Sequence, residues 1–498
     1  SLLCYGLSAI YSVYFHPLSH IPGPWYMAAS RIPYIIATIK GSTPTFMSDL
    51  HESYGDVVRY TPNEVSFISG ETAWADIYGF RTGRNKGTGS FEKDRVWYAP
   101  SVDDVDSMVR AHGAHHGRQR RILSHAFSTQ ALKQQEGLVM QYVDLLVSRL
   151  KEVTSRSDAA VDMSKWYNWT TFDIISDLTF GKSLGCLADL ATHPYVDLIM
   201  NFIKAFGMYY VQSYWPWVNY LGSFVVDPSI AAKGKEADDW FRSQTHKRLA
   251  DQTRRPDFMH MILAHRYDYG QGEGISDGEI VSNAANLLAA GTDTTSIVLS
   301  TATFMMLTRP EESSKLKAEV RERFTSSDEI TVDAASQLPY LNAFITEAMR
   351  HKPPVPAGFV RKVPLGGAEI SGYHIPGNCD ASVSVSQYAA YHSARNFALP
   401  NSFIPERWIE GADSRFASDN KATFQPFSFG PRNCIGKNLA WMEMRMLLAK
   451  MVVNFDFEMD ERSKSWDTDM PVLALWQRPE LFVKVKEVKR ASGSTLPL

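Results

Sequence analysis

The stretch FSFGPRNCIG (427–436) stands before a segment rich in Leu and Met whose pattern predicts a helix over about 437–453. A cysteine just before a helix N-terminus, here Cys434, has its thiolate favoured by the backbone N–H groups and the helix dipole. Gly430 and Gly436 let the backbone approach another group closely, and Arg432 adds a positive charge. A thiolate held in this way can ligate a soft metal or haem iron. A buried, inert thiol is the alternative, which the pattern F-x-x-G-x-R-x-C-x-G disfavours.

Composition limits the class of protein. Of the 498 residues, 44% are hydrophobic and 21% are charged, so the chain can bury a sizeable core and is not of disordered composition. The net charge of −3 gives no sign of nucleic-acid binding. Four scattered cysteines are too few for a disulfide framework and favour a reducing compartment. The sequence contains no C-x-x-C, H-E-x-x-H or P-loop motif.

The N-terminal segment, residues 1–15, carries no charge. It is shorter than the ~20 residues that a membrane-spanning helix needs. We expect a truncated membrane-anchor segment, supported by aromatic residues where a membrane interface would lie; a buried helix is the alternative. Residues 16–30 are expected to be a proline-rich hinge, because Pro17, Pro22 and Pro24 cannot continue a helix.

Hydrophobic periodicity predicts a mainly α-helical chain with small β-sheets. Residues 56–69 have the pattern of two short strands, and a helical pattern dominates from about 71 to 350. Ser276 and Glu279 form a capping box. The helix that it opens is expected to reach about Leu307, which is ~31 residues or ~46 Å. Later strands are expected in VSVSQYAA (383–390) and ELFVKVKEV (480–488).

Inside this long helix lies the hexapeptide AGTDTT (290–295). A glycine beside several threonines weakens a helix and favours a local kink. One interpretation is a helix-packing notch, in which Gly291 admits a neighbouring backbone. The functional interpretation depends on a family resemblance.

The cysteine stretch resembles the haem-binding loop of the cytochrome P450 family, the haem-thiolate monooxygenases. The wider text PFSFGPRNCIGKNLAWMEMR (426–445) is similar to the fungal microsomal branch, and AGTDTT matches the family's A-G-x-D-T-T motif. The resemblance implies a cytochrome P450 fold with a long central helix over haem, and a single haem-binding catalytic domain over 31–498. It implies Cys434 as the iron ligand, with a cofactor-binding loop that includes Phe427, Gly430, Arg432 and Gly436.

On the other side of the haem, the resemblance implies an acid and an alcohol that relay protons to O2, Asp293 and Thr294. Ala290 and Gly291 would leave room for O2 and substrate. Further contacts to the haem propionates are implied at His116, Arg120 and Arg361; His116 stands where the family usually has Trp, and a solvated basic turn is the alternative. Val355, Ala357, Gly358 and Leu473 are expected to line a substrate pocket.

Glu347-Ala-Met-Arg350 and Pro405-Glu-Arg407-Trp408 resemble the family's E-x-x-R and P-E-R-F elements, with Trp408 where Phe is commoner. Charge spacing alone favours a solvated surface pair. The apolar flanks and the resemblance instead imply a buried structural network of Glu347, Arg350 and Arg407 that locks the cysteine loop.

We therefore expect a haem-thiolate monooxygenase that inserts one oxygen atom from O2 into a lipophilic small molecule, such as a fungal terpenoid or polyketide of secondary metabolism. A desaturase, ring-forming or phenol-coupling oxidase of the same fold remains open. A non-catalytic haem-binding sensor is a further alternative, against which the intact AGTDTT argues.

The cofactor is expected to be non-covalent haem b, with electrons from NADPH. They would arrive through a separate NADPH–cytochrome P450 reductase, with cytochrome b5 as a further partner. Arg118, Arg121 and Lys437 are expected to form a basic patch for the acidic flavoprotein; solvated surface charge is the alternative. The resemblance places a monomer on the endoplasmic reticulum membrane, with its catalytic domain facing the cytosol and no nucleic-acid partner.

Overall fold

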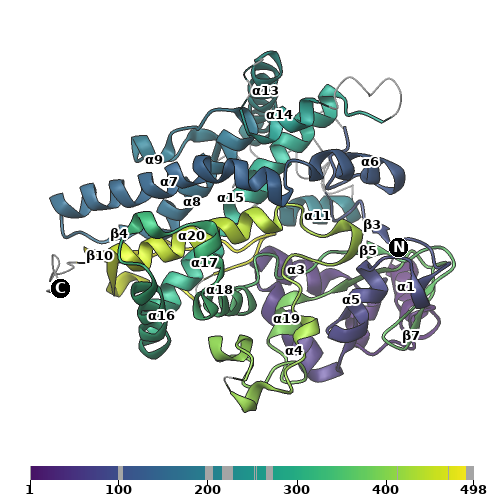
Figure 1. The fold of residues 1–498 in the computed structure, drawn as a ribbon. Helices are drawn as coiled ribbons and strands as arrows, with labels where there is room; N and C mark the ends of the chain where they lie inside the picture. The colour runs from purple at the N-terminus through teal and green to yellow at the C-terminus, as the bar shows by residue number, and fades with distance from the viewer. Residues whose placement is uncertain are drawn as a thin grey trace, which may run out of the picture.

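The computed structural model describes residues 2–98, 105–196, 206–215, 228–251, 253, 255–264, 273–411, 413–468 and 470–488. Helices dominate it and the sheets are small (Figure 1), so the predicted fold class is confirmed. The helices are α1 (Leu2–Tyr14), α2 (Trp25–Ala29), α3 (Ile32–Lys40), α4 (Thr43–Tyr54), α5 (Gly70–Tyr78), α6 (Gly113–Ser124), α7 (Thr129–Arg156), α8 (Met163–Phe180), α9 (Cys186–Asp189), α11 (Phe206–Tyr214), α13 (Pro228–Ala250), α14 (Phe258–Leu263), α15 (Asp277–Thr308), α16 (Pro310–Arg323), α17 (Val332–Ser336), α18 (Pro339–His351), α19 (Gln387–Tyr391) and α20 (Lys437–Asn454).

The 32-residue helix α15 runs through the middle of the molecule (Figure 1). The predicted capping box is confirmed, since the Ser276 hydroxyl accepts from the Glu279 N–H while the Glu279 side chain accepts from the Ser276 N–H. The helix ends before Arg309 and Pro310, as expected from the proline. Its main neighbour is α8, which is buried along almost all of its length. With α7, α18 and α20, these helices enclose the larger hydrophobic core.

A second core lies against a five-stranded sheet of order β1-β2-β8-β5-β3. Its strands are β1 (Val57–Thr61), β2 (Glu64–Phe67), β8 (Ser382–Val385), β5 (Arg361–Lys362) and β3 (Glu92–Lys93). Only the β2–β8 pair among them is parallel. The smaller sheets combine β4 (Val161–Asp162), β10 (Phe482–Glu487) and β9 (Phe455–Met459), and β6 (Ala368–Ile370) with β7 (Tyr373–Ile375).

The strand expected over 383–390 is only half right. The strand β8 ends at Val385, and Gln387–Tyr391 forms the helix α19, which packs on α4 and α18. The four residues of β8 alternate between serine and valine and pair with the neighbouring strands. The following segment QYAAY is helical, and as a helix it buries Ala389, Ala390 and Tyr391. The division of the chain into anchor, hinge and one catalytic domain stays a prediction.

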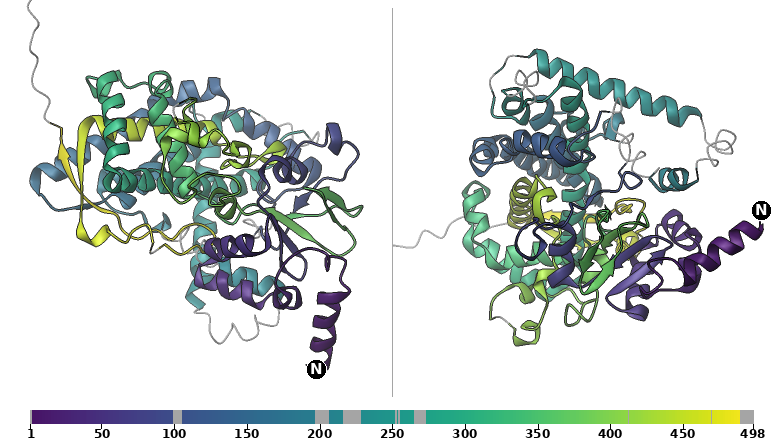
Figure 2. Two further views of the ribbon diagram at one scale, coloured as in Figure 1. Left: turned by 90° about the horizontal axis from the view of Figure 1, so that it is seen from below. Right: turned by 90° about the vertical axis from the view of Figure 1, so that its right-hand side faces the viewer.

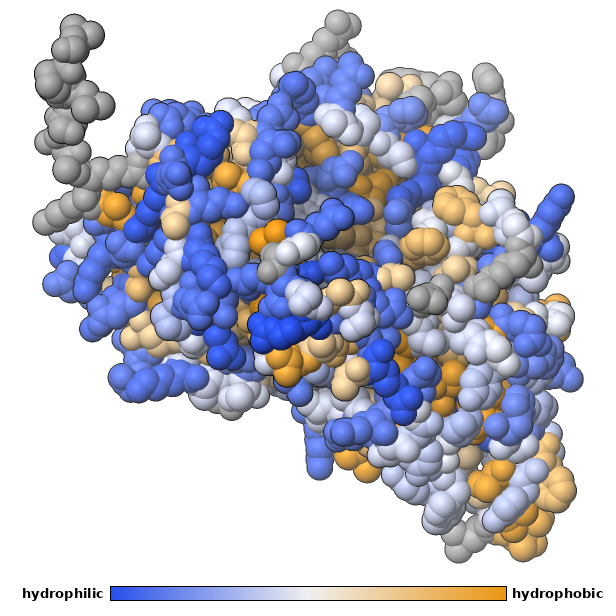
Figure 3. Space-filling view, turned by 60° about the horizontal axis from the view of Figure 1, so that its bottom comes forward, coloured by the Kyte–Doolittle hydropathy of each residue, from blue (hydrophilic) through white to orange (hydrophobic). Residues whose placement is uncertain are grey.

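The N-terminal helix α1 projects from the rest of the molecule (Figure 2). Hydrophobic side chains gather at this projecting corner (Figure 3), and Leu3, Tyr5, Tyr14 and Phe15 are exposed. The C-terminal end of α1 is joined to α2 by a hydrogen bond, because Ser12 Oγ donates to the Ala28 carbonyl at 2.5 Å. The expected hinge contains the short helix α2, which buries Met27 and Ala28. Within the described residues, no helix has both the length and the apolar character needed to cross a bilayer.

A buried carboxylate, Glu347 of α18, joins distant segments of the chain. It accepts from Arg350 Nη2 at 2.8 Å and Nε at 2.9 Å, and from Arg407 Nε at 3.2 Å. The indole N–H of Trp408 donates to it at 2.8 Å, a bond that the commoner phenylalanine could not make. Burial raises the pKa of Glu347, but the arginine charges outweigh it and hold the pKa below its usual value of 4.5.

The two arginines also bind the irregular segment that follows α19. Arg350 donates to the carbonyls of Tyr391, Pro400 and Ser402 at 2.8, 2.7 and 2.9 Å. Arg407 pairs with Asp419 at 2.5 Å, a partner that the sequence motifs do not signal. Irregular buried backbone needs such donors because it lacks the regular bonds of helices and strands. The network thereby fixes the chain that leads to the cysteine loop.

Replacing the central carboxylate should destabilise the protein strongly. Glu347→Gln leaves the buried Arg350 without its counter-charge and Arg407 with Asp419 alone, at a cost of about 3–5 kcal/mol. Trp408→Phe removes one hydrogen bond to a charged group, at about 1.5–3 kcal/mol. Urea unfolding of both variants at neutral pH measures these losses, with Glu322→Gln on the exposed side of α16 as the control. Because the folded pKa of Glu347 is lowered, its stabilisation is complete above pH 4.5 and disappears as the pH falls further. Equal stabilities of wild type and Glu347→Gln would contradict the network's structural role.

Candidate functional site

The cysteine loop is a closed, rigid turn. The N–H of Cys434 donates to the Phe427 carbonyl at 2.8 Å, which ties the two ends of the loop together. Gly430 has φ +72°, and a Cβ built there would lie 2.0 Å from the Tyr78 carbonyl oxygen, so only glycine fits. Gly436 differs, because a Cβ there would meet Cys434 Sγ and Phe127 only at 4.0 Å. The fold of the protein chain therefore requires a glycine at position 430 but has room for a Cβ at position 436.

Cys434 lies three residues before the first residue of α20, Lys437, and it is accessible. Burial raises the pKa of its thiol above the usual value, and the Gly436 N–H and the charges of Arg120 and Lys437 offset that rise only in part. A thiol with reachable sulfur and this electrostatic support is suited to ligate a metal centre as the thiolate. The described residues contain no group of three or more His, Cys, Asp or Glu side chains that could hold a metal ion by themselves.

One face of α15 stays open although the helix crosses the core. Leu287 and Thr294 are half-buried and Ala290 is exposed, at spacings that place them on one side of the helix, whereas residues 295–306 are buried. The hydroxyl of Thr294 donates to the Ala290 carbonyl at 2.7 Å. This open face offers a place for a ligand next to the threonine.

Gly291 has a different role from the one expected. A Cβ there would lie 2.7 Å from Ile175 Cγ1 of α8, so the missing side chain makes room for the neighbouring helix and not for O2 or substrate. The packing notch considered for the AGTDTT segment is thus present at this residue. Gly358 is similar, because it has φ +83° and a Cβ there would lie 1.9 Å from the Val385 carbonyl of β8.

Asp293 is buried beside the open face of α15, about 100° around the helix from Thr294, and it pairs with Arg478. The same arginine donates to Ser296 Oγ at 2.5 Å. Burial raises the pKa of Asp293 above its usual value, and Arg478 opposes that rise. Asp293 and Thr294 are adjacent in sequence but have different partners: Asp293 binds Arg478, and the Thr294 hydroxyl donates to the Ala290 carbonyl. Arg478 lies 185 residues away in the chain, and no local motif marks it.

A cluster of cations surrounds the start of the cysteine loop. Arg120 of α6 donates to both the carbonyl and, at 2.6 Å, the side-chain oxygen of Asn433, next to Cys434. His116, one turn earlier, is buried, and its pKa falls to about 3 through burial and the charges of nearby cations. His116 is accordingly neutral at physiological pH, and its burial disfavours the alternative of a solvated basic turn at this residue.

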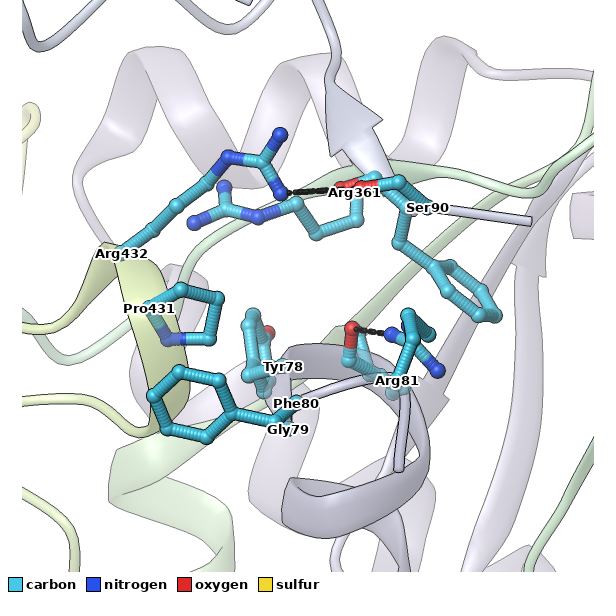
Figure 4. A pocket seen from close by; sticks show the side chains of 10 residues that line it. Tyr78, Gly79, Phe80, Arg81, Ser90, Arg361, Pro431 and Arg432 are labelled. Atoms are coloured by element: carbon cyan, nitrogen blue, oxygen red, sulfur yellow. Dashed lines mark hydrogen bonds between the residues drawn. The ribbon is translucent and has the colours of Figure 1, made fainter. Parts of the chain in front are cut away.

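Arg361 of β5 and Arg432 complete this cluster. Both line a hollow that Tyr78, Arg81 and Pro431 also border, and Figure 4 shows their guanidinium groups at the same side of it. Arg432 donates to Glu92 at 2.7 Å, yet its Nε is buried without a partner in the described structure. Arg361 donates to the Val360 carbonyl at 3.1 Å and to the Tyr98 hydroxyl.

These features fit a haem. A reachable cysteine sulfur precedes a helix, an open helix face carries small and apolar residues, and beside the loop lies an excess of positive charge that suits two propionates. Of the expected pocket residues, Val355, Ala357 and Leu473 are half-buried, as residues beside an internal space would be.

Comparison with known proteins agrees with this site. The family model for cytochrome P450 matches residues 23–485. The cytochrome P450 monooxygenase traB of Penicillium crustosum is 48% identical over 97% of this chain and 95% of its own length. The monooxygenases lcsI of Purpureocillium lilacinum and efuB of Hormonema carpetanum are 41% and 42% identical, over 98% and 97% of this chain and 93% and 94% of theirs. The chain belongs to the cytochrome P450 family of monooxygenases.

Proposed function

We propose that this monooxygenase binds haem b through Cys434 and oxidises a lipophilic small molecule, a terpenoid or polyketide of fungal secondary metabolism being the class expected. The observation that carries the proposal is the accessible Cys434 sulfur at the start of α20, next to a cluster of buried cations. When bound, the haem supplies the iron at which O2 is reduced and cleaved, with one oxygen atom going to the substrate and the other to water.

The protein's own residues hold and orient the reactants. The Phe427 carbonyl and the Gly430 turn fix Cys434, and Arg120 fixes Asn433 beside it. Arg361, Arg432 and the neutral His116 supply donors for the propionates. Glu347, Arg350 and Arg407 act at a distance, by holding the segment that enters the loop.

Thr294 and Asp293 are proposed to move protons to O2 on the open face of α15. The Thr294 hydroxyl is bonded to the Ala290 carbonyl, and rotating it away frees the proton for transfer. Asp293 must leave Arg478 to take part, because its carboxylate is bound there. Arg478 would thus hold the acid in place and offset part of the rise in its pKa that burial causes.

The substrate class rests on the chemistry of the open face. Leu287, Ala290, Val355, Ala357 and Leu473 offer carbon surface, which suits an apolar molecule. A desaturation, ring closure or phenol coupling on the same substrate remains the alternative outcome. A haem-binding sensor is less well supported, because a sensor has no need of the buried Asp293–Arg478 pair beside Thr294.

Electrons are proposed to come from NADPH through a separate reductase, with cytochrome b5 as a further donor. Arg121 and Lys437 are exposed and suit docking of an acidic protein. Arg118, expected in the same patch, pairs instead with Glu279 at the start of α15, so its charge is already engaged.

We place the protein on the endoplasmic reticulum membrane as a monomer, with the catalytic part in the cytosol. The support is an apolar surface that α1 shares with Trp25 and with Ile32, Ile36 and Ile39, all exposed. The three isoleucines recur at helical spacing along one face of α3.

Deleting residues 1–15 should weaken membrane binding without loss of haem, because α1 contributes exposed apolar area and no residue of the site. Flotation with phosphatidylcholine–phosphatidylserine vesicles measures the bound fraction, and the absorption spectrum measures haem content. Trp25→Ser should act in the same direction, whereas Leu190→Ser, beside α9, is the control for losing an exposed apolar side chain. Unchanged flotation of the deletion would argue against an anchor, and loss of haem would favour the buried-helix interpretation.

Product analysis tests the reaction itself. Enzyme supplied with a reductase, NADPH and candidate terpenoids or polyketides should yield a product heavier by one oxygen atom, and with labelled O2 that atom should carry the label. Cys434→Ala should give no product and no thiolate-type carbonyl spectrum after reduction. Loss of two hydrogens, or a dimer, would select the alternative oxidase. An unaltered carbonyl spectrum in Cys434→Ala would remove the basis of the proposal.

The proton relay predicts a specific failure. Thr294→Ala should still bind haem and substrate and consume O2, but release hydrogen peroxide in place of product; Asp293→Asn should slow product formation by roughly 10²–10⁴-fold. Arg478→Met should also uncouple, because the unpaired, buried Asp293 then takes up a proton, whereas Arg478→Lys should restore part of the coupling. NADPH, peroxide and product are measured together at saturating substrate. Normal coupling in Thr294→Ala and Asp293→Asn would reduce the segment to a packing element.

A further inference from the structure

Two buried basic side chains face each other across the edge of the five-stranded sheet. Lys93 of β3 is the direct cross-strand partner of Arg361 of β5. Side chains of directly paired residues lie on the same face of a sheet, and like charges in that position are destabilising. The two residues are only 5% and 3% exposed, so water does not screen the repulsion.

Within the residues that the structure describes, no carboxylate forms an ion pair with Lys93 or Arg361. Lys93 Nζ donates to the Met108 carbonyl at 2.7 Å, and Arg361 donates to a carbonyl and to the Tyr98 hydroxyl. These acceptors carry no charge. Burial, followed by the charges of Arg361, Arg432 and Arg120, lowers the pKa of Lys93 to about 6, and Glu92 opposes them only in part.

Neighbouring groups show the same lack of negative charge. Glu92 is the carboxylate that these cations share, but it is bound to Arg432 at 2.7 Å and lies 3.7 Å from His112 Nδ1. Within the described structure, the Nε of Arg432 and the Nε2 of His112 are buried without hydrogen-bond partners. An arrangement of this kind has lower energy when an anion with several oxygen atoms enters it.

We propose that Lys93 is a further haem-binding residue, whose ammonium group pairs with a propionate beside Arg361 and Arg432. The inference depends on the proposed ligation by Cys434, since Arg432 stands two residues before that cysteine and brings the cluster to the edge of the haem. None of the sequence motifs points to Lys93. Its position follows from the pairing of a two-residue strand with β5.

Lys93 then explains an otherwise costly arrangement. A propionate next to the amine replaces like-charge repulsion by attraction and favours the protonated form, so the energy stored in the cluster contributes to holding the cofactor. A positive charge near the propionates also favours the reduced, less positive iron, because it offsets their negative field. Haem retention and midpoint potential should therefore both respond to Lys93.

The experiment compares purified haem-loaded wild type with Lys93→Met, Lys93→Arg and Lys362→Met. Lys362 is the matched control, because it adjoins Arg361 on the same strand but pairs with Asp380 and Asp94 on the other side. Haem transfer to excess apomyoglobin gives the rate of haem loss, and spectroelectrochemistry gives the midpoint potential. Lys93→Met should lose haem about 10- to 100-fold faster, as expected for a hydrogen bond between charged groups, and have a lower potential. Lys93→Arg should retain both properties, and Lys362→Met should match wild type.

The outcomes separate this inference from the proposed function. If Arg361→Met accelerates haem loss and Lys93→Met changes neither haem loss nor potential, Lys93 only supports the Met108 backbone and the inference is wrong. If Cys434→Ala keeps a thiolate-type spectrum, the haem lies elsewhere and the proposed function fails first. If Lys93→Met yields no folded protein, Lys93→Gln provides the same loss of charge, and an unchanged rate and potential there would equally overturn the inference. Protection of Lys93→Met against haem loss by added inorganic phosphate would indicate a general anion site and also count against it.

Discussion

The conformation of the chain that enters the cysteine loop depends on one buried carboxylate, Glu347, and on the two arginines that neutralise it. Glu347 lies on a regular helix, whereas the chain between α19 and α20 is mostly irregular and only partly buried. Such a segment cannot satisfy its own carbonyls, so Arg350 and Arg407 donate to them and are in turn held by Glu347 and Asp419. A buried ion pair of this kind adds little net stability compared with apolar packing. Its value here is that it fixes one conformation of the segment that carries Cys434.

The protein treats its other buried charges in two ways. Asp293 and Arg478 compensate each other directly and link the central helix to the C-terminal segment. The basic groups beside the cysteine loop instead have few carboxylate partners among the described residues, and burial together with neighbouring cations lowers the pKa values of His116 and Lys93. Pairs that are neutral overall fix the conformation of the segments they join, whereas uncompensated charge stores energy that a bound anion releases. The distinction separates structural from ligand-binding arginines, although both kinds are buried.

Much of the fold was predictable from local patterns. The capping box at Ser276, the long helix and the strands on either side of Pro62 all follow from residues within a few positions of one another. The strand expected over 383–390 was half wrong because tertiary packing favours a helix after Val385. Gly291 had two local interpretations, and the neighbour Ile175, more than a hundred residues earlier, decides for helix packing. Similar reasoning separates Gly430, which only glycine can occupy, from Gly436.

The sequence by itself determined the family, the loop around Cys434 and the residues that form its network, because these are contiguous motifs whose chemistry depends on residue type and spacing. Tertiary structure alone decided the partners of those residues: Trp408 and Asp419 in the network, Arg478 on Asp293, and Lys93 opposite Arg361. The physical reason is that an unpaired buried charge is costly, so each buried charge is stabilised by an opposite charge close to it in space, and that partner can come from any part of the chain. A sequence shows which groups are charged, but only the folded chain shows which of them meet and which are left for a ligand.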